Sequence, residues 1–276
     1  MLRLSVCRDG CALTGVATLD RLALMKSVSE NVLAGALPVS LNGEAVLCLR
    51  SGACYLPDAG TLIVADLHFE KGSAYAARGQ MLPPYDTIET LAALSEIVDA
   101  LRPSVVVSLG DAFHDPRAMS RMPPPAQEAL TRLTSAADWV WISGNHDPST
   151  PDHLAGLRTA DLAVGALTLR HEPTVGSAEG EVAGHLHPCA RVASRAGTVR
   201  ARCFAFDRNR IVLPAFGALT GSLNVCDPAF AGLFEDGLVA GVIGRDRVYA
   251  TPSARLVPDR AGPGVRTAPR RAAQDG

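Results

Sequence analysis

Five segments of the chain each place metal-binding or proton-transferring side chains directly after a run of apolar residues. In chain order they are Asp66-Leu67-His68, Gly110-Asp111, Gly144-Asn145-His146-Asp147, His171 and Gly184-His185-Leu186-His187. Together they offer imidazole nitrogens, carboxylate oxygens and an amide oxygen. This donor set suits Mn²⁺, Fe²⁺ or Zn²⁺, and it disfavours Ca²⁺ or a thiolate-rich centre.

The spacing within these segments predicts how the donors converge. Side chains alternate along an extended chain, so Asp66 and His68 are expected on one side, as are His185 and His187. Each pair can therefore meet at one centre or at two adjacent ones. The preceding glycines allow sharp turns and a close approach of the backbone. The donors suffice for two ions that share a carboxylate, and two ions about 3.5–4 Å apart can hold a phosphate and activate water.

The elements that must position these donors alternate between strands and helices. Apolar or β-branched runs predict strands at 46–49, 62–65, 105–109, 139–142, 167–169 and 182–183. The alternation with helices indicates an α/β sheet, and open sheets of this kind bind ligands at the carboxyl ends of their strands. Shorter strands expected within 191–250 predict a second sheet packed on the first.

Two helices are predicted between these strands. The first spans 87–101, with an apolar stripe formed by Ile88, Leu91, Leu94, Val98 and Leu101. Asp86 and Glu89 resemble a capping box at its start, and Pro103 ends it. The second helix runs from Pro125 to about Ala136, with proline in its first turn.

The overall composition is that of an ordinary globular protein. Of 276 residues, 47% are hydrophobic and 20% are charged, and 26 basic residues against 28 acidic ones leave a net charge of −2. Neither a membrane span nor an export signal is recognisable, so a cytoplasmic protein is predicted. The seven cysteines form no C-x-x-C pair, which favours reduced, mostly buried thiols. Three parts are predicted: an N-terminal extension of uncertain structure (1–36), the main domain (37–252) and a flexible basic tail (253–276).

Taken in order, D-x-H, G-D, G-N-H-D, a lone His and G-H-x-H resemble the signature of the calcineurin-like metallophosphoesterases over residues 38–250. The resemblance implies an αββα sandwich of two packed mixed sheets flanked by helices. It implies that Asp66, His68 and His187 hold one metal and that Asp111 bridges. It further implies that Asn145, His171 and His185 hold the second metal. By the same resemblance His146 steadies the phosphate and protonates the leaving oxygen, and Asp147 orients His146.

A narrower resemblance rests on ADLHFEKG around Asp66, GDAFHD around Asp111 and LPAFGALTG at 213–221. These motifs are similar to those of the bacterial ligase-associated DNA damage response endonucleases. The resemblance implies DNA as substrate, two divalent metals with Mn²⁺ foremost, and work beside a DNA ligase or helicase repair system. Phe69 and Glu70 stand where a smaller apolar pair is expected.

Four further residues are candidate substrate contacts. Lys71 is either a solvated lysine or a phosphate contact, and His114 either forms a structural hydrogen bond or touches substrate. Arg191 and Arg195 open a segment, 191–210, with six arginines against one aspartate, a local charge of +5. This segment is either a basic surface for a polyanion or the outward face of a strand pair.

Three functions remain open at this point. The first is a dinuclear-metal phosphodiesterase cleaving nucleic acid, in particular a DNA endonuclease in repair, through in-line attack by activated water. The second is a phosphatase or phosphodiesterase on small nucleotides or other phosphoesters, which the same ligands would serve. The third is a binding module that has lost catalysis, against which the full ligand set and His146 argue.

Overall fold

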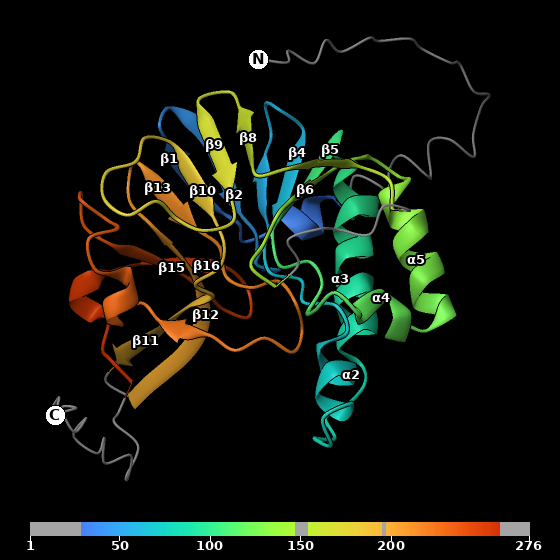
Figure 1. The fold of residues 1–276 in the computed structure, drawn as a ribbon. Helices are drawn as coiled ribbons and strands as arrows, with labels where there is room; N and C mark the ends of the chain where they lie inside the picture. The colour runs from blue at the N-terminus through green and yellow to red at the C-terminus, as the bar shows by residue number, and fades with distance from the viewer. Residues whose placement is uncertain (1–28, 147–153, 195–196, 260–276) are drawn as a thin grey trace, which may run out of the picture.

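The computed structural model describes residues 29–146, 154–194 and 197–259. Two mixed β-sheets pack face to face, and helices cover the outer face of the first (Figure 1). The expected sandwich of two packed mixed sheets is thereby confirmed.

The first sheet has seven strands in sequence order. They are β1 (Leu37–Leu41), β2 (Glu44–Cys48), β3 (Cys54–Leu56), β4 (Thr61–Val64), β5 (Val105–Leu109), β6 (Asp138–Ile142) and β7 (Leu157–Thr159). Strands β1 to β4 pair antiparallel, whereas β4 to β7 pair parallel. The carboxyl ends of β4, β5 and β6 therefore meet along one edge.

The second sheet has nine strands. They are β8 (Asp161–Val164), β9 (Leu167–Arg170), β10 (Glu181–Ala183), β11 (Pro188–Ser194), β12 (Gly197–Phe206), β13 (Arg210–Val212), β14 (Leu223–Asn224), β15 (Val239–Ile243) and β16 (Val248–Pro252). Strands β9, β10 and β13 are parallel neighbours. Their carboxyl ends form a second edge. Residues that follow the strands at this edge contact residues that follow the strands of the first sheet, as described below.

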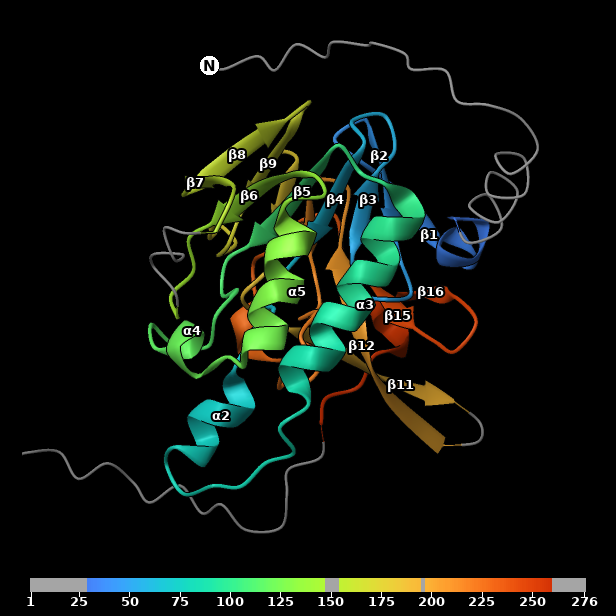
Figure 2. The same cartoon turned by 90° about the vertical axis from the view of Figure 1, so that its right-hand side faces the viewer.

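Three apolar clusters hold the layers together. One lies between the sheets and combines residues such as Ile63 and Val107 with Leu169 and Phe204. The second lies between the first sheet and the helices α3 (Asp86–Leu101) and α5 (Pro124–Thr134), which cross its face side by side (Figure 2). The third packs β11, β12, β13 and β15 against residues 223–234, which include the 3-10 turn η1 (Pro228–Phe230). In the part of the chain that the structure describes, this turn and its flanking loops cover the second sheet where α-helices were expected.

Two short helices lie beyond the carboxyl ends of the first-sheet strands. They are α2 (Lys71–Ala76) and α4 (Ala118–Arg121). Elsewhere in the chain, a second 3-10 turn, η2 (Ser253–Arg255), follows β16. Helix α2 follows the segment after β4, and α4 follows the segment after β5. Both segments carry predicted ligands, so the two helices border the candidate site.

Helix α3 departs from two expectations about its start. Asp86 forms no side-chain cap on α3; its carboxylate accepts the backbone N–H of Gly72 in α2 at 2.9 Å. The predicted capping box is therefore wrong, and Asp86 instead joins α3 to α2. Ile88 is 57% exposed and does not belong to the buried stripe, whereas Leu91, Leu94 and Val98 do.

The ends of the described chain contact the sandwich. Val248 donates its backbone N–H to Gly35, and Val257 donates to Arg191 at 2.8 Å in each case. Residues 253–259 thus include ordered contacts within the predicted tail, and the three-part division stays a prediction. The five described cysteines are free thiols. Over the described ranges, no helix combines the length and apolarity that crossing a bilayer requires.

Candidate metal centre

The two sheets bring most of the predicted metal ligands to one place. Asp66, Asp111 and Asn145 follow β4, β5 and β6, while His171 and His185 follow β9 and β10. His187 lies between β10 and β11. The convergence at the carboxyl ends of parallel strands agrees with the expectation for open α/β sheets.

The local backbone differs from the extended form that the sequence predicted. Among the described non-glycine residues, eight have positive φ, and five of these are predicted ligands. They are Asp66, His68, Asp111, His185 and His187, with φ between 45° and 68°. Left-handed residues are uncommon outside glycine and cluster at functional sites, where surrounding structure holds them. Simple alternation of side chains therefore does not explain why these donors converge.

Two glycines make the close approach possible. Gly110 has φ of +72°, and a Cβ there would lie 2.4 Å from His171 Nδ1. A Cβ on Gly184 would lie 2.9 Å from a carboxylate oxygen of Asp66. The expectation that glycines before Asp111 and His185 permit close backbone approach is confirmed.

A first group of donors consists of Asp66, His68 and His187. His187 Nε2 lies 3.4 Å from Asp66 Oδ1 and 3.3 Å from His68 Nε2. Asp66 is fully buried and accepts the backbone N–H of His185 at 3.0 Å. The ring of His187 is oriented from its other side, because Nδ1 donates to the carbonyl of Gly221 at 3.1 Å.

A second group consists of Asp111, His171, His185 and Asn145. His171 Nε2 lies 3.6 Å from Asp111 Oδ2, 2.9 Å from Asn145 Oδ1 and 3.1 Å from His185 Nδ1. On its other side, His171 Nδ1 donates to the carbonyl of Leu109 at 2.8 Å. That bond leaves the lone pair of Nε2 directed at the other donors.

Asp111 stands between the two groups. Its Oδ2 lies 3.9 Å from His68 Nε2 in the first group and 3.6 Å from His171 Nε2 in the second. Its other oxygen, Oδ1, accepts the backbone N–H of His146 at 2.8 Å. One oxygen is thus held by the chain, while the other is shared between both groups.

The arrangement of these nitrogen and oxygen atoms suits binding of divalent cations better than hydrogen bonding among the side chains themselves. The lone pair of His171 Nε2 faces the oxygen of Asn145, and the Nε2 atoms of His68 and His187 face one another. Burial, followed by the nearby His187 and Lys71, lowers the pKa of His68 to about 2, which keeps this ring a neutral donor. Its Nδ1 is buried and finds no hydrogen-bond partner among the described residues. Lone pairs that converge without donors are satisfied by a positive ion between them.

His187 responds differently to the same surroundings. Burial by itself lowers its pKa, but the hydrogen bond to Asp66 and the charge of that carboxylate outweigh burial and raise it. A metal ion that binds His187 must therefore displace a proton that Asp66 favours.

His146 and His114 lie beside the first donor group. The ring centroids of His146 and His68 are 5.1 Å apart, and the exposed His146 stacks on His114 at 5.3 Å. His146 Nδ1 donates to the backbone carbonyl of His114 at 3.1 Å. Nitrogens of the three rings lie within 4.8 Å of one another, a grouping the sequence did not predict. Asp147, predicted to orient His146, lies outside the described residues.

Lys71 acts on His68 and His114 through its charge. It opens α2, is half-buried, and contributes to lowering the pKa of both His68 and His114. Burial lowers its own pKa, partly offset by the charge of Asp86. This placement is compatible with the predicted phosphate contact, which stays a prediction.

The arginine-rich segment 191–210 is less available than its sequence charge suggests. Arg210 is 1% exposed and forms a buried ion pair with Glu181, so it contributes nothing to a basic surface. Arg202 is half-buried and donates to the carbonyl of Ala215 at 2.9 Å. Arg191 donates to Thr198 and to the carbonyl of Pro258, and Arg195 lies outside the described residues. The charge of +5 therefore overstates the surface that a polyanion could meet.

Two structural roles near the site were not predicted. Residues 213–221 contact the segments that carry the first donor group: Gly217 approaches the carbonyl of Leu67 so closely that a Cβ would lie 2.2 Å away, and the carbonyl of Gly221 orients His187. Phe69 is fully buried and packs on Phe113 at 5.8 Å, which joins the segments after β4 and β5. The LPAFGALTG motif was a signal for the first role, although it did not reveal the contact.

Comparison with known proteins agrees with this geometry. Residues 61–190 match the family model described as calcineurin-like phosphoesterase. The structure is similar to that of Pseudomonas putida nuclease MPE, with 26% sequence identity, a TM-score of 0.59, and coverage of 78% of this chain and 100% of that one. It also matches a protein of unknown function, AQ665 from Aquifex aeolicus, at 14% identity, covering 50% of this chain and 81% of that one; the TM-score of 0.34 is too low to support an argument.

A comparison with curated protein sequences finds no match. The family match includes all the described strands that carry the donor groups, from β4 to β10. Residues 61–190, which carry all the donor groups, are therefore similar in sequence to the calcineurin-like phosphoesterases.

Proposed function

We propose that this metal-dependent phosphoesterase cleaves phosphodiester bonds of nucleic acid, and that its substrate is DNA. The observation that carries the proposal is the position of Asp111 Oδ2, within 4 Å of one imidazole in each donor group. A single carboxylate oxygen so placed can bridge two ions. Two ions, when bound, supply positive charge beside a phosphate and activate water for in-line attack.

In this proposal the ligands divide as the two groups do. Asp66, His68 and His187 hold one ion, while His171, His185 and Asn145 hold the other. The hydrogen bonds from His171 to Leu109 and from His187 to Gly221 engage Nδ1 of each ring, which would leave Nε2 as the atom that binds an ion. Mn²⁺ is the proposed metal, because mixed imidazole and carboxylate ligation suits it; Fe²⁺ and Zn²⁺ share that preference.

His146 is the proposed general acid. Because its Nδ1 donates to the carbonyl of His114, Nε2 is the nitrogen free to carry a proton to the leaving oxygen. The exposure of His146 places this nitrogen where a bound substrate can reach it. Asp147 is proposed to orient His146, and Lys71 to contact the phosphate.

Nucleic acid is preferred over small phosphoesters for two reasons. The similar structure from Pseudomonas putida is that of a nuclease. His146 is exposed at the site and Lys71 is half-buried beside it, which leaves a rim that a long strand can approach. We further propose that the enzyme is cytoplasmic and acts in DNA repair beside a ligase or helicase, in the endonuclease mode that its sequence motifs suggest.

The decisive assay compares DNA with a small diester. Purified protein with Mn²⁺ should cleave single-stranded, nicked or gapped DNA, and Asp111→Ala should abolish cleavage. His146→Ala should lower kcat by about 100- to 10,000-fold, the usual contribution of a general acid. Hydrolysis of bis(p-nitrophenyl) phosphate without cleavage of any DNA form would overturn the nucleic-acid assignment and favour a small substrate.

A further inference from the structure

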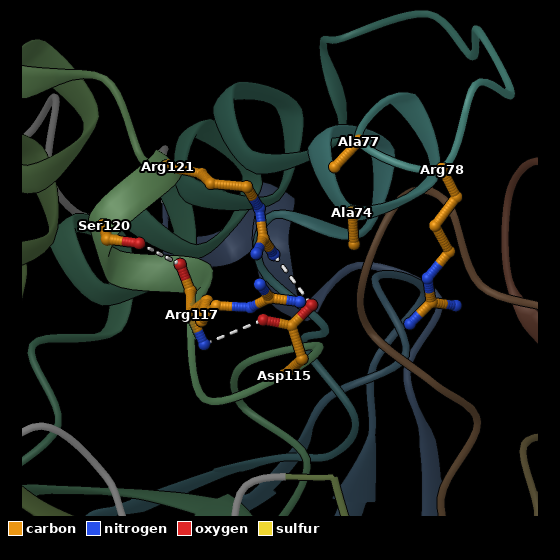
Figure 3. Close-up of a pocket in the computed structure, with 7 residues that line it drawn as sticks. All are labelled: Ala74, Ala77, Arg78, Asp115, Arg117, Ser120 and Arg121. Atoms are coloured by element: carbon orange, nitrogen blue, oxygen red, sulfur yellow. Dashed lines mark hydrogen bonds and ion pairs between the residues drawn. The ribbon is translucent and has the colours of Figure 1, made fainter.

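A cavity of about 340 Å³ lies between α2 and α4, next to the metal centre and outside it. Arg78, Arg117 and Arg121 line it together with one carboxylate, Asp115, and small residues such as Ala74. Figure 3 shows Arg117 and Arg121 beside Asp115 and Arg78 on the opposite side. Three guanidinium groups against one carboxylate leave two positive charges in a small space. We call these residues the arginine pocket.

Only one of the three arginines is neutralised. Arg121 pairs with Asp115 at 2.9 Å and also donates to Ser73 Oγ at 3.0 Å. Asp115 in addition accepts the backbone N–H of Arg117 at 2.8 Å. Both oxygens of the Asp115 carboxylate therefore have partners within the wall of the pocket.

The other two arginines are available to a ligand. Arg78 and Arg117 are exposed, and within the described part of the chain neither side chain forms an ion pair or hydrogen bond. Guanidinium groups match phosphate oxygens with two parallel hydrogen bonds, and the fixed Arg121–Asp115 pair gives the pocket a rigid wall. The pocket thus has the charge and geometry for a single phosphate group.

The pocket adjoins the proposed reaction site through His114. Asp115 directly follows His114, whose ring stacks on His146 at 5.3 Å and lies 6.0 Å from Tyr75 in α2. One step along the chain and one ring contact thus connect the pocket to the proposed general acid. A strand bound at the metal centre could therefore place a neighbouring phosphate in the pocket.

We propose that the arginine pocket binds a backbone phosphate of the nucleic-acid strand that neighbours the phosphate at the cleaved bond. This inference rests on the proposed function, because a flanking phosphate exists only in a polynucleotide. It assigns Arg78 and Arg117 to strand binding, and Arg121 and Asp115 to shaping the pocket. A small phosphodiester cannot reach the pocket and the metal centre together.

The test compares Arg78→Ala/Arg117→Ala with a control that removes the same charge elsewhere. Arg102 and Arg132 serve as the control, since both are exposed and precede β5 and β6, at the ends of those strands opposite the site. For each protein, kcat/KM is measured with Mn²⁺ on an oligonucleotide and on bis(p-nitrophenyl) phosphate. Anisotropy of a labelled oligonucleotide is measured from 50 to 200 mM salt, and equal melting temperatures verify folding.

The expected result is that the pocket variant lowers the ratio of the two kcat/KM values about tenfold or more. For the pocket variant, the slope of log affinity against log salt concentration should also be shallower by about 1 to 2, as expected when two phosphate contacts are lost. The control Arg102→Ala/Arg132→Ala should match wild type. A pocket variant that behaves like the control overturns the inference while DNA cleavage by wild type still supports the proposed function. Failure of wild type to cleave or bind the oligonucleotide overturns both.

Discussion

Replacement of Gly184 by alanine tests whether the position of Asp66 matters for metal binding. The new Cβ would lie 2.9 Å from Asp66 Oδ2 and 3.0 Å from Ala65 Cβ, although the backbone of Gly184 needs no positive φ. Ordinary carbon contacts lie near 3.5 Å, so the carboxylate must move by roughly 0.5 Å. Metal sites tolerate deviations of only about 0.2 Å in ligand distance.

Displacing Asp66, a proposed metal ligand, should weaken both metal binding and folding. Gly184→Ala should weaken Mn²⁺ binding by about 10- to 100-fold, or about 1.4 to 2.8 kcal/mol. Crowding should also lower the free energy of unfolding of the metal-free protein by about 1 to 3 kcal/mol. Isothermal titration of chelator-treated protein with Mn²⁺ measures the first effect, and urea unfolding measures the second.

The matched control is Gly221→Ala. No atom lies within 4 Å of the Cβ built at Gly221, its φ is not positive, and its carbonyl still accepts the hydrogen bond from His187. This variant should bind Mn²⁺ like wild type and gain up to about 0.4–1 kcal/mol from the lower entropy of its unfolded chain. Equal metal affinity of the two variants would refute the reasoning, because it would mean that displacing Asp66 has no effect on the ion.

Three further predictions concern stability. Arg210→Ala should lower the free energy of unfolding by about 3–5 kcal/mol in urea, because it leaves Glu181 buried without its cation; a loss under 1 kcal/mol would contradict this. Burial alone raises the pKa of Asp115, but the hydrogen bonds from Arg121 and from the backbone of Arg117, together with the charge of Arg121, outweigh burial and lower the pKa. The stability that Asp115 adds, about 1 kcal/mol at most, is therefore present above pH 4 and lost as pH falls through the lowered pKa. Asp115→Asn and wild type should differ in urea at pH 7, and the difference should shrink as the pH is lowered below 4. Phe69→Ala should cost about 3–5 kcal/mol by opening a cavity against Phe113, and calorimetry showing an unchanged melting temperature would rule that packing role out.

The features that could be predicted are those encoded locally. Val105–Leu109 is a buried, β-branched run followed by Gly110 and Asp111, and this order alone predicts a strand that delivers a carboxylate at its end. The helix predicted at 87–101 agrees with α3 for the same reason. The convergence of the donors followed from strand ends and parallel pairing.

The features that could not be predicted depend on contacts between distant residues. Asp86 has the local pattern of a cap for α3, yet its carboxylate accepts the backbone N–H of Gly72 in α2, 14 residues earlier in the chain. Arg210 looks like a surface charge in sequence, but folding pairs it with Glu181 in the interior. No local pattern distinguishes a polar side chain that faces water from one that finds a buried partner.

Anomalous diffraction from crystals grown with Mn²⁺ tests the central claim most directly. Two peaks about 3.5–4 Å apart are expected, as in two-metal sites generally. One should lie among Asp66, His68 and His187 and the other among Asn145, His171 and His185, with Asp111 touching both. A single peak, or peaks that leave Asp111 out, would contradict a bridged two-metal centre.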